Sequence, residues 1–200
     1  MPSLRERKRQ QTMRAITEEA VKLSLERGVE NITVEDICQA ANISKRTFFN
    51  YVDSKEAAIY GSPPTMVTEE EIEEFAAEKR DNLLHAALEL FFAHVNDDGA
   101  TQEVIKLRKT LMQKHNNNGY SFGAGFFGLI HSITDALTKY FEVWPEQRQF
   151  PDEARATASL AFTAVQLGFS RWLCSENVTP QSCIKYAEDA LTDLRRVIED

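Results

Sequence analysis

Cysteine is scarce in this chain of 200 residues, which has only Cys38, Cys174 and Cys183. A low and odd number excludes a framework of disulfides and is typical of proteins from a reducing compartment. Cys174 and Cys183 flank a predicted loop, where a redox pair is the alternative to two inert thiols. No apolar run approaches the roughly 18 residues that a membrane-spanning helix needs. The N-terminus lacks the apolar segment of a signal peptide, so we expect a cytoplasmic protein.

Sequence patterns of enzymes and metal sites are also missing. The chain has no glycine-rich phosphate loop, nucleophile elbow or metal-binding helix pair. Its four histidines do not stand with Cys, Asp or Glu at a metal-binding spacing. We therefore predict no catalytic residues, no metal and no cofactor, and expect that the protein is not an enzyme.

Strand-like alternation of apolar and polar residues is rare, whereas apolar residues recur at helical spacing throughout. Hydrophobic residues make up 42% of the chain, enough for a sizeable core. We therefore predict an all-α fold with about nine helices. Besides a short helical hairpin, helices are expected near residues 11–27, 54–61, 68–79, 80–95, 101–115, 120–143, 152–174 and 180–198.

The charge is distributed unevenly along the chain. The formal net charge is −8, which by itself argues against nucleic-acid binding. Residues 1–60, however, hold ten Lys and Arg against nine Asp and Glu, and the remaining residues hold 13 against 22. The first 14 residues carry five basic side chains and one acidic one. Such asymmetry is expected of a two-part DNA-binding protein.

The most informative stretch is residues 33–56, TVEDICQAANISKRTFFNYVDSKE. Thr33 is a good N-cap for a first short helix, and apolar residues follow it at helical spacing. Asn42 tolerates the left-handed conformation that a sharp turn needs. Ser44 is the N-cap of a second helix that has one apolar side and one side of long or polar donors. These features predict a helical hairpin whose second helix can enter a major groove.

This stretch resembles the DNA-binding region of the TetR family of bacterial transcriptional regulators. Two positions depart from the family pattern: Phe49 replaces a Tyr whose hydroxyl touches a phosphate, and Val52 replaces a common Phe. The resemblance implies a three-helix DNA-binding domain over residues 1–60 and a larger helical domain over residues 61–200. The residues that match in order and spacing are Thr33, Ala41, Ser44, Thr47, Phe48, Phe49, Tyr51, Val52, Lys55 and Glu56.

The resemblance also implies roles for individual side chains on double-stranded DNA. Lys45, Arg46 and Asn50 would approach base edges, since Arg can pair with guanine and Asn with adenine. Ser44 and Phe49 belong to the same predicted surface. A mobile arm over residues 1–10 adds positive charge. The predicted phosphate contacts are Thr33, Thr47, Tyr51 and Lys55, and the basic side chains of the arm are Arg5, Arg7, Lys8 and Arg9.

Four of the eight glycines lie within residues 119–128, in or beside a predicted helix. A glycine inside a helix costs about 1 kcal/mol relative to alanine. Close helix packing is one explanation, and space for a ligand beside aromatic side chains is the other. By resemblance, small-molecule effectors bind inside the C-terminal helices. The predicted pocket for a small apolar effector is lined by Phe92, His115, Phe126, His131 and Trp172.

The family resemblance further implies a homodimer through the last two helices. The leading interpretation is a ligand-responsive repressor that binds a palindromic operator and is released by its effector. The alternative is a helical interaction protein of the same fold that no longer binds DNA specifically, which the missing hydroxyl at Phe49 favours. The predicted dimer seam consists of Ala158, Ala161, Phe162, Val165, Phe169, Ile184, Ala187, Leu191 and Leu194.

Overall fold

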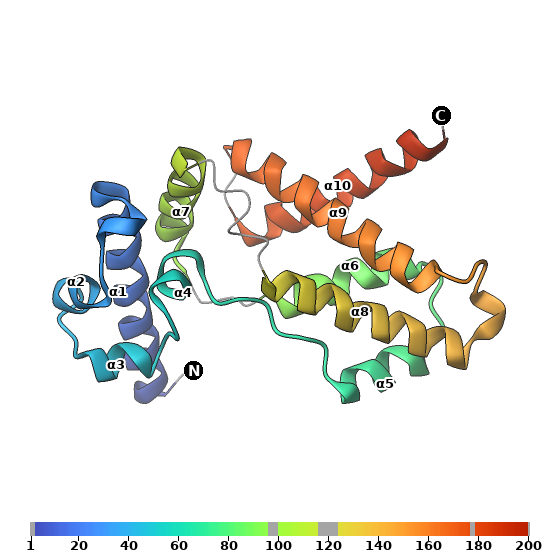
Figure 1. The fold of residues 1–200 in the computed structure, drawn as a ribbon, viewed down its shortest axis with the longest axis horizontal. Coiled ribbons are helices and arrows are strands. Elements are labelled where there is room, and N and C mark those ends of the chain that lie inside the picture. The colour runs from blue at the N-terminus through green and yellow to red at the C-terminus, as the bar shows by residue number, and fades with distance from the viewer. Residues whose placement is uncertain (1–2, 96–99, 116–123, 177–178, 200) are drawn as a thin grey trace. The chain divides into compact units, whose positions relative to one another are not determined.

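The computed structural model describes residues 3–95, 100–115, 124–176 and 179–199. This part of the chain forms ten α-helices and two short 3-10 helices, without a strand (Figure 1). The predicted all-α class is therefore confirmed. None of the helices in the described ranges is long and apolar enough to cross a membrane.

The chain divides into two compact units, each described here by itself. The N-terminal unit comprises residues 1–63 and 96–121, and the C-terminal unit comprises residues 64–95 and 122–200. The N-terminal unit is therefore built from two stretches that are far apart in the sequence. Its elements are α1 (Leu4–Arg27), η1 (Val29–Asn31), α2 (Val34–Ala40), α3 (Lys45–Phe49), α4 (Lys55–Tyr60) and α7 (Gln102–His115).

One apolar core holds the N-terminal unit together. Ile16 of α1, Ile37 of α2 and Phe48 of α3 are fully buried in it. Leu111 of α7 is fully buried in the same core, so α7 completes the unit that the hairpin belongs to. Burial of each such side chain stabilises the fold by about 1.5–3 kcal/mol.

Helix α1 begins at Leu4, so residues 4–10 of the expected mobile arm are helical instead, while residues 1 and 2 lie outside the described part of the chain. Residues 4–11, LRERKRQQ, show no apolar periodicity, which is why the sequence favoured an arm. Leu, Arg, Glu, Lys and Gln are nevertheless good helix formers, and no Gly or Pro interrupts them. The helix therefore begins about two turns before Met13, which is the first of its residues that packs against the core.

Helix α4 is held at its C-terminal end by a buried arginine. Arg108 of α7 donates from Nε to the carbonyl of Ile59 at 2.7 Å and from a terminal nitrogen to that of Ala58 at 3.5 Å. A cation is favourable there because the last carbonyls of a helix carry partial negative charge. The helix ends at Gly61, whose φ of 99° lies in the left-handed region. This is the predicted break before Pro63 and Pro64.

The C-terminal unit packs its long helices around a second core. Phe91, Leu137 and Tyr140 are fully buried there. The Tyr140 hydroxyl accepts a hydrogen bond from the amide of Arg80 at 3.0 Å, which satisfies a polar group inside the core. The elements are α5 (Glu69–Ala77), α6 (Leu83–His94), α8 (Ala124–Val143), η2 (Pro145–Gln147), α9 (Glu153–Cys174) and α10 (Pro180–Glu199).

Much of the predicted dimer seam on α9 and α10 is buried inside the chain itself. Of its nine residues, five are almost completely buried in the core of their own unit, so they are not available to a second chain. The reason is that α10 packs back on α9, and apolar spacing alone does not distinguish the two faces. The five are Ala158, Ala161, Val165, Ala187 and Leu191.

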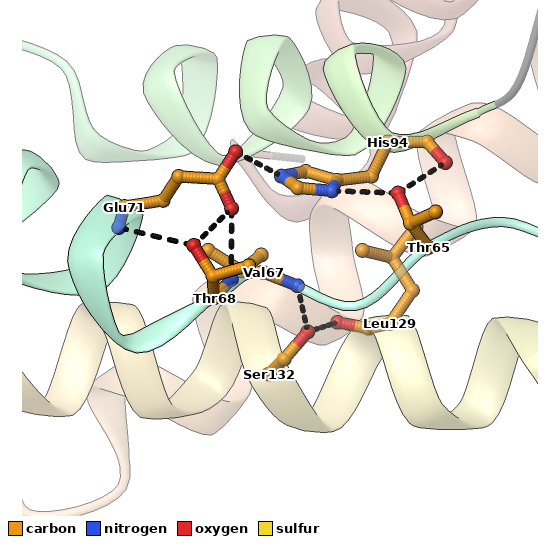
Figure 2. A network of polar contacts seen from close by, with 7 residues as sticks. All are labelled: Thr65, Val67, Thr68, Glu71, His94, Leu129 and Ser132. Atoms are coloured by element: carbon orange, nitrogen blue, oxygen red, sulfur yellow. Dashed lines mark hydrogen bonds and ion pairs between the residues drawn. The ribbon is translucent and has the colours of Figure 1, made fainter.

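A polar network fastens the start of the C-terminal unit to its helices (Figure 2). Thr65 lies next to the end of α6: its amide donates to the His94 carbonyl at 3.0 Å, and its hydroxyl is 3.0 Å from His94 Nδ1. On the other side of the ring, His94 Nε2 is 3.6 Å from a Glu71 carboxylate oxygen. The amide of Val67 donates to the Ser132 hydroxyl of α8 at 3.0 Å. The segment after α4 is thereby joined to α5, α6 and α8.

Candidate nucleic-acid interface

The first helix of the hairpin begins at a capping box. The amide of Asp36 donates to the Thr33 hydroxyl oxygen at 3.2 Å, and the amide of Thr33 donates to the Asp36 carboxylate at 2.8 Å. The Thr33 hydroxyl also donates to the Asp36 carboxylate, at 2.5 Å, and this hydrogen bond together with that from the Thr33 amide holds the pKa of Asp36 below its usual value. Thr33 thus fixes the start of α2. Any phosphate contact at this position involves a hydroxyl that already serves the cap.

The turn and the second cap set the direction of α3. Asn42 has φ 52°, the predicted left-handed conformation. Ser44 is the N-cap of α3 and accepts from the amide of Thr47 at 3.0 Å, while the two hydroxyl oxygens lie 2.8 Å apart. Phe48 points into the core and Val52 follows it there. With this apolar side anchored, the opposite side of α3 faces outward.

Long and polar side chains occupy the outward side of α3. Lys45, Arg46 and Asn50 are exposed, as donors for base edges must be. Phe49 is 54% exposed and packs edge-on against Phe48, with ring centroids 5.3 Å apart. Tyr51 is half-buried and packs against the core. The three residues that are predicted to read bases are therefore all accessible to solvent.

One acidic side chain on this surface was missed by the sequence prediction. Glu35, in the first turn of α2, forms an ion pair with Lys45, the first residue of α3. Next to it, Arg27 of α1 lies 3.5 Å from the carboxylate of Asp36. The signal that could have revealed the first pair is a Glu and a Lys near the starts of two helices joined by a tight turn.

Lys55, a predicted phosphate contact, makes hydrogen bonds within its own unit. Its ammonium donates to the carbonyls of Val29 and Ile32, at 2.8 and 3.0 Å. These carbonyls belong to the connection between α1 and α2, so Lys55 ties the start of α4 to that connection. A phosphate contact would draw on an ammonium that already has two acceptors within its own unit.

The first two turns of α1 carry the remaining predicted DNA contacts. Arg5, Arg7, Lys8 and Arg9 are all exposed. Four cations within five positions cannot lie on one face of a helix, so they surround its N-terminal end. The first two turns of α1 therefore concentrate positive charge. Such charge attracts any polyanion and does not by itself distinguish one base sequence from another.

The predicted effector residues are only partly brought together. Phe92 and Phe126 are half-buried and pack against the core of the C-terminal unit, where Phe126 stacks on Phe91 with centroids 5.8 Å apart. Trp172 stacks on Phe169 in the last turns of α9 and donates to the carbonyl of Thr179 at 3.2 Å. The side chain of His131 is 82% exposed and lies 3.9 Å from Asp135. The side chain of His115 lies outside the described part of the chain.

Two depressions of the C-terminal unit lie elsewhere. One of about 480 Å³ borders α5 and α6, and one of about 250 Å³ borders α8 and the start of α9. Neither is lined by Phe92, Phe126, His131 or Trp172. The first is lined by Glu71, Glu74, Phe75, Ala77, Glu78, Arg80 and Leu90, and the second by Thr134, Thr138, Phe141, Arg148, Pro151, Asp152, Ala154 and Arg155.

The three cysteines all lie among the described residues. All three thiols are free, and burial raises the pKa of Cys183 to about 11, so it is protonated at neutral pH and a poor nucleophile. In the same part of the chain, no group of three His, Cys, Asp or Glu side chains could hold a metal ion.

Comparison with known proteins agrees with the geometry of the hairpin. Residues 16–57 match the profile of bacterial regulatory proteins of the tetR family. The chain is also similar to the HTH-type transcriptional regulator TcmR of Streptomyces glaucescens, with 44% identity over 55 residues. That alignment spans 28% of this chain and about a quarter, 24%, of the relative. The helical hairpin and the helix before it are therefore similar in sequence to the DNA-binding region of the TetR family of bacterial transcriptional regulators.

Proposed function

We propose that this protein is a homodimeric transcriptional repressor that binds a palindromic DNA operator and is released from it by a small apolar effector. The proposed DNA binding is supported by the outward side of α3, where Lys45, Arg46 and Asn50 are exposed on a helix that Phe48 anchors in the core. Such a helix enters the major groove with its N-terminal residues at the base edges. A regulator that acts on bacterial DNA would work in the cytoplasm, which is the location that this proposal includes.

A dimer would supply two hairpins for the two halves of a palindrome. The support for it is a row of residues on α9 that leaves apolar side chains outside the core. Leu160 and Leu167 are half-buried and belong to neither core cluster. Both belong to a row of residues on α9 that are alternately four and three positions apart, which is the spacing of a helix-packing seam. The row consists of Ala156, Leu160, Thr163, Leu167, Ser170 and Cys174.

The support for an apolar effector is the aromatic cluster of the C-terminal unit. Phe126 and Phe162 are half-buried, and both rings lie within 6 Å of the buried Phe91 ring, at 5.8 and 5.9 Å between centroids. Flat apolar ligands suit such a lining. To release the operator, the effector must bind the DNA-incompetent state more tightly than the other state.

Selection from random duplexes tests the proposal. The full-length protein should enrich an inverted repeat at moderate salt. Its affinity for the enriched duplex should fall steeply as salt rises, because phosphate contacts release counterions. Arg46→Ala or Asn50→Ala should relax the selected sequence and cost about 1–3 kcal/mol each. Enrichment of no inverted repeat would contradict the proposal.

A further inference from the structure

The ion pair between Glu35 and Lys45 places a carboxylate beside the helix that is proposed to read DNA. Both side chains are exposed, 59% for Glu35 and 56% for Lys45. An exposed ion pair adds little to stability, typically less than about 1 kcal/mol. The ion pair itself therefore contributes little to the fold, although Glu35 also has the favourable place of an acidic residue in the first turn of α2. A negative charge at this place disfavours binding to a polyanion, so Glu35 affects recognition if the hairpin binds DNA.

Lysine is a poor reader of bases when it is unconstrained. Its ammonium sits on a flexible four-carbon stem and can bind any acceptor within reach. At the first residue of α3, that reach includes base edges and neighbouring phosphates alike. A carboxylate that holds the ammonium restricts the positions it can take, and it competes with the phosphates for the same charge.

We propose that Glu35 determines specificity by positioning Lys45 in the DNA-binding hairpin. This inference rests on the proposed function. On the correct sequence, Lys45 donates to a base acceptor such as guanine O6 or N7 while it remains beside Glu35. On other sequences, Glu35 keeps the ammonium away from the phosphates and its own charge repels them. Specificity then comes from weaker binding to wrong sequences as well as from contacts to the right one.

The test compares Glu35→Gln with Glu30→Gln in the full-length protein. Glu30 lies in η1 of the same unit and is also exposed, so its substitution makes the same change in charge away from Lys45. The probes are the enriched operator duplex and a duplex of unrelated sequence, each measured over a series of salt concentrations. Lys45→Met, alone and combined with Glu35→Gln, shows whether Glu35 acts through Lys45.

Glu35→Gln should strengthen binding to the unrelated duplex more than Glu30→Gln does. The ratio of operator to non-specific affinity should fall about tenfold. The dependence of log affinity on log salt for the unrelated duplex should steepen by about 0.9, the value for one added phosphate contact. When the selection is repeated with Glu35→Gln and with Lys45→Met, the enriched sequences should lose base preference at the same base pairs. In the Lys45→Met background, Glu35→Gln should behave like Glu30→Gln.

Two results separate failure of this inference from failure of the proposed function. If the wild-type protein enriches an operator but Glu35→Gln matches Glu30→Gln in affinity ratio and salt dependence, the positioning role of Glu35 is wrong and the regulator remains. If the wild-type protein shows no preference among duplexes, the proposed function itself fails, and the inference fails with it.

Discussion

At the scale of single residues, two glycines inside long helices serve different purposes. A Cβ atom on Gly168 of α9 would lie 2.4 Å from the backbone nitrogen of Ala187 in α10, closer than atoms can approach. A Cβ atom on Gly128 of α8 would meet only the flexible side chain of Met66, with its sulfur at 3.4 Å. Gly168 therefore sets the distance between two helices, whereas Gly128 lies in ordinary contact with a side chain.

Replacing each glycine with alanine should separate these roles. Gly168→Ala should destabilise the protein by about 1–3 kcal/mol or more, because backbone must move to admit the methyl group. Gly128→Ala should be neutral or stabilising by up to about 1 kcal/mol, because alanine favours the helix. Urea unfolding followed by circular dichroism measures both. Equal effects of the two substitutions would show that the α9–α10 approach is looser than described.

The roles of individual residues could be predicted from the sequence only where local chemistry decides them. Asn42 in the turn and Ser44 at the cap are local features, and both predictions are confirmed. The contacts of Lys55 with Val29 and Ile32 depend on how distant parts of the chain fold together, which spacing does not encode. The pair of Glu35 with Lys45 has a local signal, because the two residues lie near the starts of helices joined by a tight turn, and it was missed because spacing along one helix does not show a contact across the turn.

At the scale of elements, helix α5 depends on a capping box at its start. Thr68 donates from its amide and hydroxyl to the carboxylate of Glu71, at 2.8 and 2.7 Å, and accepts from the amide of Glu71 at 3.3 Å. These hydrogen bonds lower the pKa of Glu71, and the nearby His94 adds to the effect. The ionised carboxylate is thus the form that stabilises the fold.

Thr68→Ala should cost about 1 kcal/mol at neutral pH. Because the folded pKa of Glu71 lies below its unfolded value of about 4.3, this stabilisation is complete above that value. It is lost as the pH falls through the folded pKa. The difference in unfolding free energy between wild type and Thr68→Ala should therefore shrink below about pH 4. A difference that stays constant from pH 7 to pH 3.5 would contradict the role of Glu71.

Most helix boundaries could be predicted because the signals for them are local. Ser54 and Thr68 cap their helices as expected, and Gly61 ends α4. The predicted start of α1 was wrong because apolar periodicity reports contact with a core, and the first two turns of α1 make no contact with the core. Which apolar residues of α9 lie in the core of its own unit could not be predicted, because apolar spacing does not distinguish the face that packs against α10 from the other faces.

At the scale of the whole molecule, the proposed dimer depends on the face of α9 that its own unit leaves uncovered. Wild-type protein should sediment as a dimer at micromolar concentration. Leu160→Asp and Leu167→Asp should each produce folded monomers, because an unpaired charge in a dimer seam is costly. Leu191→Asp is unsuitable, since Leu191 is 6% exposed and its substitution would disrupt the core.

Leu4→Asp is a matched control for this experiment. Leu4 is 78% exposed at the start of α1, in the other unit, so the same chemical change there should leave the dimer intact. Circular dichroism must show full helical content for every variant. Dimers that persist in both Leu160→Asp and Leu167→Asp would place the contact elsewhere.

The division of the N-terminal unit into two stretches limits how this chain could be recombined with a related one. Residues 16–57 carry the family similarity, yet α7 lies outside them and contributes Leu111 and Arg108 to the same unit. A crossover between two related genes near codon 60 would join one parent's α1–α4 to the other parent's α7. The hybrid would then need a foreign helix to fill the space of Leu111 and to satisfy the end of α4. If the proposed DNA binding holds, an exchange of specificity with a relative would therefore need to transfer two segments, or only the few surface codons of α2 and α3.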